Sequence, residues 1–199
     1  SGDYELYNLK VIRTGRTAGT TTGYAILNDN ALGYLRCFGV YFINDFGHSC
    51  NGRGKYYGVY SVAYLDAIRD TVGNAEVYDS YAESTGTGIG INTPVGYIYN
   101  SIGKGVSNHG IVSNGTIYNS TGISSGGYGI SSQNANSCVA ISSTNYGGNG
   151  NFKNSTLISV SNYGAFRGTH LNCSIISSSA YGINEPVSLN NCYVESSSN

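Results

Sequence analysis

The feature that most constrains the fold of this chain is a repeat of about 19 residues, a period typical of solenoids, in which each repeat forms one unit that stacks on the next. The repeated pattern is an aliphatic residue, a tyrosine and a third residue. After residue 130 the pattern keeps its aliphatic residue but loses its tyrosine. Its copies are Val40-Tyr41-Phe42, Val59-Tyr60-Ser61, Val77-Tyr78-Asp79, Ile98-Tyr99-Asn100 and Ile117-Tyr118-Asn119.

A second series has the same period but a different phase. It centres on a glycine that an aromatic residue usually precedes. Two series with one period define the repeat and place several β-type segments in each copy. The members are Gly90-Ile91, His109-Gly110-Ile111, Tyr128-Gly129-Ile130, Tyr146-Gly147, Tyr163-Gly164-Ala165 and Tyr181-Gly182-Ile183.

The repeats are of the β type. Their short apolar segments are separated by Gly, Ser and Asn, and no stretch has helical periodicity. The chain has 29 glycines among 199 residues, and Gly, Ser, Asn and Thr all disfavour helix interiors. The Leu-x-x-Leu-x-Leu frame of a leucine-rich repeat is absent. We therefore expect an all-β fold, a right-handed single-stranded parallel β-helix solenoid of about nine coils of roughly 18–22 residues.

Side chains alternate along a strand, so the aliphatic residue of each repeat is expected in the core and the tyrosine outside. The third residue, such as Asn100 or Asn119, is expected at a bend, where Asn tolerates unusual backbone angles and can bond its stacked copy. Coils stack about 4.8 Å apart, which places equivalent residues above one another. One outer column is predicted from Tyr41, Tyr60, Tyr78, Tyr99 and Tyr118, and another from Tyr128, Tyr146, Tyr163 and Tyr181.

Residues 1–35 fit the repeat poorly. We expect them to form an irregular first coil or cap, although Leu9–Ile12 and Gly23–Leu27 look like strands. Residues 36–199 are expected to form the β-helix as a single domain. Ser1-Gly2 looks like the scar of a cleaved tag, so the chain is expected to be a fragment of a longer protein.

At this point the chain resembles the pectate-lyase-like superfamily of right-handed β-helices, and within it the shafts of phage tailspikes, tail fibres and related adhesins. The resemblance covers roughly residues 35–195 and rests on the Ile-Tyr-Asn-Ser and Gly-Ile-Ser-Ser coils. It implies a protein that binds or cleaves carbohydrate and forms a homotrimer. It also implies a location on a virion tail or another extracellular surface.

Charge and hydropathy exclude some partners. The formal net charge is −1 and no Lys/Arg cluster is present, so nucleic acid is not an expected partner. No apolar run is long enough to span a bilayer, so membrane insertion is not expected either.

The cysteines and histidines show no metal-ligand spacing, and we expect no metal site and no cofactor. The odd number of cysteines predicts free thiols that behave as small buried hydrophobes. Cys173 and Cys192 lie one repeat apart and are predicted to stack as thiols in neighbouring coils. The residues considered are Cys37, Cys50, Cys138, Cys173, Cys192, His48, His109 and His170.

Hydrolysis or elimination on a polysaccharide requires clustered carboxylates. After residue 83 the only acids are Glu185 and Glu195, so an active site of this kind would lie in the first half. The candidate catalytic residues are Asp66, Asp79 and Glu83, with Arg69 nearby. Residues one coil apart lie side by side, so Asp66 and Glu83, 17 residues apart, are expected to be neighbours. The alternative interpretation is that these are solvated surface charges and a bend-capping Asp79.

The tyrosines have three interpretations: sugar recognition, a subunit interface, or stacking that stabilises the solenoid. On the first, the candidate carbohydrate-binding residues are Tyr60, Tyr78, Tyr99 and Tyr118. The leading functional prediction is a receptor-binding or adhesin domain of the tailspike type that recognises a cell-surface glycan. The alternatives are a polysaccharide lyase or glycoside hydrolase of the same fold, and a structural trimeric spacer.

Overall fold

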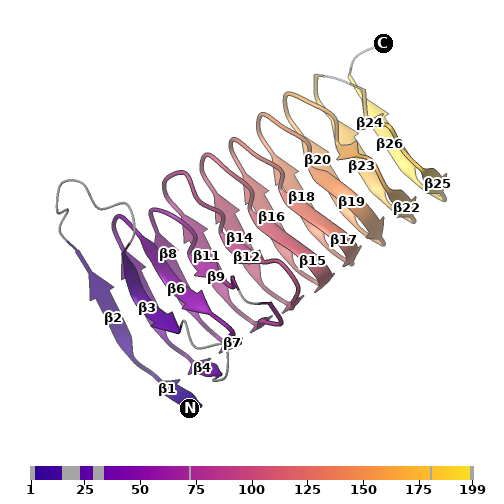
Figure 1. Cartoon of the computed structure of the whole chain (residues 1–199). Coiled ribbons are helices and arrows are strands. Elements are labelled where there is room, and N and C mark those ends of the chain that lie inside the picture. Colours follow the sequence, from indigo (N-terminus) through magenta and orange to yellow (C-terminus); the bar gives the residue numbers. More distant parts are fainter. Residues whose placement is uncertain (1–2, 15–22, 29–33, 72, 180, 198–199) are drawn as a thin grey trace.

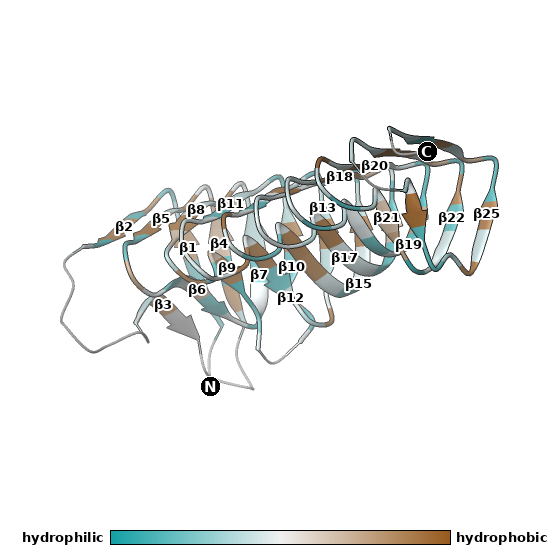
Figure 2. Ribbon diagram, turned by 90° about the horizontal axis from the view of Figure 1, so that it is seen from above, coloured by the Kyte–Doolittle hydropathy of each residue, from teal (hydrophilic) through white to brown (hydrophobic). Residues whose placement is uncertain are grey.

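The computed structural model describes residues 3–14, 23–28, 34–71, 73–179 and 181–197. Every regular element in these ranges is a β-strand, and the strands stack into a solenoid with β1 and β26 at opposite ends (Figure 1). Seen from above, the coils follow one another along one axis (Figure 2). The all-β parallel solenoid expected from the repeat is therefore confirmed, while its right-handed winding and the number of nine coils stay predictions. None of the described residues belongs to a helix that could serve as a membrane span.

One side of the solenoid is a parallel sheet of ten strands. Each strand contributes two residues that face outward and two that face the core. In stacking order the strands are β2 (Lys10–Arg13), β5 (Tyr41–Asn44), β8 (Tyr60–Ala63), β11 (Tyr81–Ser84), β14 (Ile102–Gly105), β16 (Thr121–Ser124), β18 (Val139–Ser142), β20 (Thr156–Ser159), β23 (Ser174–Ser177) and β26 (Tyr193–Ser196).

The other sides form a sixteen-stranded sheet with two branches that merge in the middle and separate again. The first branch contains β1 (Tyr4–Tyr7), β4 (Leu35–Phe38), β7 (Gly54–Tyr57), β10 (Glu76–Tyr78) and β13 (Tyr97–Tyr99). The second contains β3 (Tyr24–Asn28), β6 (His48–Gly52), β9 (Ile68–Arg69) and β12 (Ile91–Thr93). The long strands β15 (Ile111–Tyr118), β17 (Ile130–Asn136) and β19 (Gly148–Lys153) join them, and β21 (Ala165–Phe166), β24 (Ile183–Asn184), β22 (Thr169–Leu171) and β25 (Ser188–Asn190) follow.

The described part of residues 1–35 pairs with the coil that follows it. Strand β1 is in register with β4, β2 with β5, and β3 with β6. The two segments expected as strands are therefore strands, at Lys10–Arg13 and Tyr24–Asn28. Residues 15–22 and 29–33 lie outside the described residues, and the division of the chain at residue 35 stays a prediction.

Stacked apolar side chains fill the interior. Val77, Ile98 and Ile117 are in register in β10, β13 and β15 and are fully buried, as the alternation predicted. Burial of an aliphatic side chain of this size contributes about 1.5–3 kcal/mol. The repeated aliphatic residue therefore adds apolar packing to the backbone hydrogen bonds that join each coil to the next.

An unusual backbone conformation turns the chain between β10 and β11 and at the equivalent place in later coils. Asp79, Asn100 and Asn119 have φ angles of 50°, 49° and 47°, in the left-handed region that Asn and Asp tolerate better than most residues. Asn100 Nδ2 donates to Asp79 Oδ1 at 3.1 Å. The bend position and the bond between stacked copies are thus confirmed for this pair.

The serine after each bend connects two coils. Ser101 Oγ donates to the Tyr99 carbonyl at 2.7 Å and accepts the N–H of Ser80 at 3.2 Å. Ser120 Oγ makes the same bonds, to the Tyr118 carbonyl at 2.7 Å and from Ser101 N–H at 3.1 Å. Because these groups are buried, the bonds avoid the cost of leaving polar atoms unpaired.

The left-handed bend can be tested at Asn119. We expect Asn119→Ala to lower the free energy of unfolding in urea by about 1 kcal/mol, because a Cβ without a polar group is disfavoured at this φ. Asn119→Gly relieves that penalty and should be near neutral. Equal losses for the two variants would contradict the role of the bend conformation.

Candidate functional site

The tyrosines predicted for the first outer column, from Tyr41 to Tyr118, lie in two columns and not in one. The register pairs Tyr60 with Tyr81 and not with Tyr78. Tyr78 pairs instead with Tyr57. The prediction of a single column was wrong because a bend separates Tyr78 from Tyr81, which puts them on adjacent strands of different sheets. The first tyrosine column is Tyr7, Phe38, Tyr57, Tyr78, Tyr99 and Tyr118, and the second is Tyr41, Tyr60 and Tyr81.

The rings of the first tyrosine column lie face to face. Neighbouring centroids are 4.8–5.2 Å apart and the ring planes differ by 8° or less. A stacked pair of aromatic rings contributes about 0.5–1.5 kcal/mol beyond its buried area. Inside the column each ring has a neighbour on both faces, so the interior tyrosines offer a ligand only their edges and hydroxyl groups.

The first tyrosine column ends at Tyr118. The next residue in register is Asn136, followed by Lys153 and Leu171. At this end the outer face of the sixteen-stranded sheet has a groove of about 350 Å³. We call it the column-end groove; its lining residues are Thr116, Tyr118, Asn134, Ala135, Asn136, Asn151, Phe152, Lys153, Thr169 and Leu171.

A second, polar groove of about 220 Å³ adjoins it and shares Asn151. It follows the same strands, β15, β17 and β19, where the two branches of the sheet have merged. We call it the amide groove; its lining residues are Asn114, Ser131, Ser132, Gln133, Asn149, Gly150 and Asn151. Amide and hydroxyl groups are the main polar groups of both grooves, and Lys153 is the only charged residue among the described residues that line them.

The three candidate catalytic acids lie in three different places. Asp66 is buried before β9, Asp79 is exposed at a bend, and Glu83 faces outward from β11. The register places Glu83 beside Val62, not beside Asp66, because this coil is longer than the spacing between the two acids. The structure therefore does not bring the predicted acids together.

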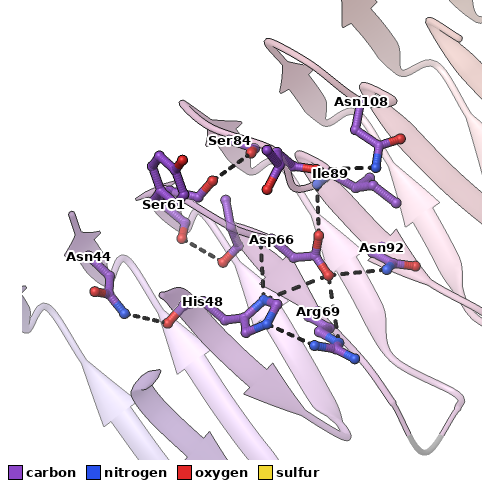
Figure 3. Close-up of polar contacts among 12 residues, drawn as sticks. Asn44, His48, Ser61, Asp66, Arg69, Ser84, Ile89, Asn92 and Asn108 are labelled. Atoms are coloured by element: carbon purple, nitrogen blue, oxygen red, sulfur yellow. Dashed lines mark hydrogen bonds and ion pairs between the residues drawn. The ribbon is translucent and has the colours of Figure 1, made fainter. Parts of the chain in front are cut away.

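Asp66 is held by its neighbours on all sides (Figure 3). Its Oδ1 accepts the N–H of Ile89 at 2.7 Å, and its Oδ2 accepts from Asn92 Nδ2 at 3.2 Å. Asp66 Oδ2 also lies 3.6 Å from Arg69 Nε and 3.7 Å from His48 Nδ1. With 7% of Asp66 exposed, the carboxylate is a structural anchor for the corner rather than an accessible acid.

Glu83 also has partners. It accepts hydrogen bonds from Lys104 Nζ at 2.7 Å and from the Tyr81 hydroxyl at 2.6 Å. Burial alone would raise the pKa of Glu83, but these two donors outweigh it and the pKa is lowered. A carboxylate with a lowered pKa is a poor general acid at neutral pH.

The second predicted outer column is confirmed. Tyr128, Tyr146, Tyr163 and Tyr181 stack in successive coils, with centroid separations of 5.5, 5.6 and 6.3 Å. His109 begins this column, 4.6 Å from Tyr128, and its Nδ1 accepts the N–H of Tyr128 at 2.8 Å. This histidine therefore has a structural role.

All five cysteines are free; Cys37, Cys50, Cys138 and Cys173 are buried as expected, whereas Cys192 is only partly buried. Cys173 and Cys192 lie in neighbouring coils, where the N–H of Tyr193 bonds the carbonyl of Cys173. Burial raises the pKa of Cys138 to about 11, so this thiol is unreactive at neutral pH. Within the described ranges no group of three or more His, Cys, Asp or Glu side chains could hold a metal ion.

The comparisons with known proteins add no assignment: the chain matches no protein-family model, no curated protein and no solved structure. Functional inference therefore depends on the grooves and columns themselves.

Sequence reasoning named Tyr118 as a binding residue but missed Tyr57, Tyr81 and the other residues of both grooves. The tyrosine pairs were detectable, because Tyr57-Gly58-Val59-Tyr60 and Tyr78-Asp79-Ser80-Tyr81 repeat the same spacing across a bend. The grooves had no comparable signal, since they arise where an aromatic column stops and shorter side chains replace it.

The His109 contact predicts a pH dependence of stability. Burial lowers the pKa of His109 in the folded chain, so the unfolded chain binds a proton that the folded chain does not. The stabilisation is complete above the unfolded pKa of about 6.5 and is lost as the pH falls toward the folded pKa. Burial also lowers the pKa of His48 and His170, so these two histidines contribute to the same pH dependence.

We expect the free energy of unfolding to fall between pH 7 and about pH 5. His109→Phe keeps the ring stack but cannot titrate, so its decrease over this range should be smaller, even though it loses the hydrogen bond to Tyr128. Urea unfolding at several pH values measures this. An unchanged pH slope in His109→Phe would exclude His109 as a contributor.

Proposed function

We propose that this solenoid is a carbohydrate-binding domain of the receptor-binding or adhesin type, and that it holds a cell-surface polysaccharide in its two adjoining grooves. The observation that carries the proposal is the lining of these grooves by amides, hydroxyls and one terminal aromatic ring. Such groups match the hydroxyl groups and the apolar faces of sugars.

The course of the grooves supports an extended ligand. They adjoin one another across β15, β17 and β19, and several of their polar side chains, including Asn114, Gln133 and Asn134, are exposed. The backbone N–H of Asn134 bonds Ser132 Oγ, but among the described residues the side chains of Gln133 and Asn134 have no hydrogen-bond partner. Unpaired, exposed amides are free to bond the hydroxyl groups of a chain that lies along the surface.

Binding is favoured over catalysis by the positions of the acids. A glycoside hydrolase requires two carboxyl groups about 5–10 Å apart on either side of the bond that is cleaved. The three candidate acids are far from this arrangement: Asp66 lies in a buried corner, Asp79 at a bend and Glu83 on the ten-stranded sheet. No carboxylate is among the described residues that line the grooves. The homotrimer and the location on a virion tail or other extracellular surface, expected from the resemblance, stay predictions.

Removal of the exposed amides tests the proposal. A glycan array first identifies the glycans that the protein binds. The double variant Gln133→Ala/Asn134→Ala should bind these glycans at least about tenfold more weakly, because each lost hydrogen bond contributes about 1 kcal/mol. Thr156→Ala, on the outer face of the ten-stranded sheet, is the matched control and should bind normally. A protein that binds no glycan on the array would contradict the proposed function.

A structural spacer is the second candidate, and one observation favours it. The outer face of the ten-stranded sheet carries no charge from β16 to β23 and presents a column of half-buried isoleucines. A flat uncharged face of this kind can pack against a copy of itself. The outward residues are Thr121, Ile123, Val139, Ile141, Thr156, Ile158, Ser174 and Ile176.

On this second proposal, Ile141→Lys should dissociate any oligomer, because it places a charge in the centre of the face. Light scattering coupled to size-exclusion chromatography measures the mass in solution. Lys153→Ala, on the other sheet, serves as the control. An oligomer that persists in Ile141→Lys would exclude this face as the contact.

A further inference from the structure

We infer that the column-end groove holds one pyranose ring bearing a carboxylate, stacked on Tyr118 and paired with Lys153. The ligand would be an acidic polysaccharide, such as one that contains a uronic acid. This inference rests on the proposed function and deepens it, since it names the class of sugar and the position of its charged residue.

The first support is the open face of Tyr118. Among the described residues only Tyr99 stacks on this ring, at 5.2 Å. Tyr57, Tyr78 and Tyr99 each have a ring on both faces. Tyr118 is thus the ring of the first tyrosine column that combines a free face with an adjacent groove.

The second support is the space above that face. The residue in register with Tyr118 in the next coil is Asn136, whose side chain is much shorter than a tyrosine. The outer half of the Tyr118 ring is therefore not covered by the next coil, and the column-end groove lies there. Successive coils are about 4.8 Å apart, so a flat ring placed in this space continues the stack with nearly the spacing of the tyrosines.

The third support is an available positive charge. Lys153 follows Asn136 in register, is exposed and lines the same groove. Two of the three other lysines have acidic partners, Lys55 with Glu76 at 2.9 Å and Lys104 with Glu83 at 2.7 Å, and Lys10 lies over the ring of Tyr41. No described residue forms such a pair with Lys153.

Acidic side chains that could compete for Lys153 are scarce in this part of the molecule. The two acids after residue 83 are engaged elsewhere: Glu185 pairs with Arg167 at 3.1 Å, and Glu195 accepts from the hydroxyl of Tyr193. Lys153 is two coils, or roughly 10 Å, from the level of Tyr118. A ring stacked on Tyr118 lies between them, so a carboxylate on its far side comes within reach of the flexible ammonium group.

The test begins with the whole chain on an array of neutral, sulfated, sialylated and uronic-acid oligosaccharides. The best carboxylated oligosaccharide and its carboxyl-reduced form are then compared by calorimetry. We expect the carboxyl-reduced form to bind about tenfold more weakly, as expected for the loss of one charge-assisted hydrogen bond. The affinity for the acidic form should decrease as salt concentration rises.

Variants separate the two contacts. Lys153→Gln should reduce the affinity for the acidic oligosaccharide about tenfold without changing that for the reduced form, and Lys153→Arg should retain most of it. Tyr118→Leu should weaken binding of both forms, while Tyr118→Phe keeps the stacking face. Tyr81→Leu is the matched control, because Tyr81 also ends a tyrosine column but lines neither groove. Thermal unfolding of each variant verifies that it is folded.

The outcomes distinguish this inference from the function on which it rests. The inference is overturned if the protein selects neutral or only sulfated sugars. It is also overturned if Lys153→Gln and the original chain bind the acidic oligosaccharide equally well. Both results leave carbohydrate binding in place. Equal losses in Tyr81→Leu and Tyr118→Leu would likewise overturn it. The absence of binding to any oligosaccharide overturns both.

Discussion

The structure depends on the hydrogen bonding of parallel strands between successive coils. This bonding holds equivalent backbone positions about 4.8 Å apart, so a residue in one coil lies directly over its counterpart in the next. The aliphatic residues of the repeat then build a continuous core, and the left-handed bends at Asp79, Asn100 and Asn119 recur at one edge. Since many side chains stack on a side chain of the same type, the small stabilisation from each contact adds up along the axis.

The same spacing decides what the tyrosines can do. A separation of about 5 Å is the stacking distance of aromatic rings, so rings within a column cover each other's faces and contribute mainly to stability. Only an end ring such as Tyr118 keeps a face for a ligand. The interpretations of the tyrosines as stabilising stacks and as sugar-binding residues are therefore compatible, because they apply to different members of the same column.

Much of the fold was predictable from the repeat, whereas the site was not. The period, the inward aliphatic residues and the column that follows His109 were visible in the sequence and are present in the structure. The assignment of Tyr60 to the column of Tyr78 failed because the coils differ in length, and only the register shows where a bend absorbs the difference. Asp66 and Glu83 were separated for the same reason.

By itself the sequence determined that this chain winds into stacked β-coils, because a residue pattern with a fixed period can bury its apolar positions only by repeating one local structure. Tertiary structure alone decided which residues become neighbours across coils. The open face of Tyr118, the grooves beside it and the placement of Lys153 away from every described acidic side chain exist because three coils meet in one register. No local pattern in any one coil specifies that register.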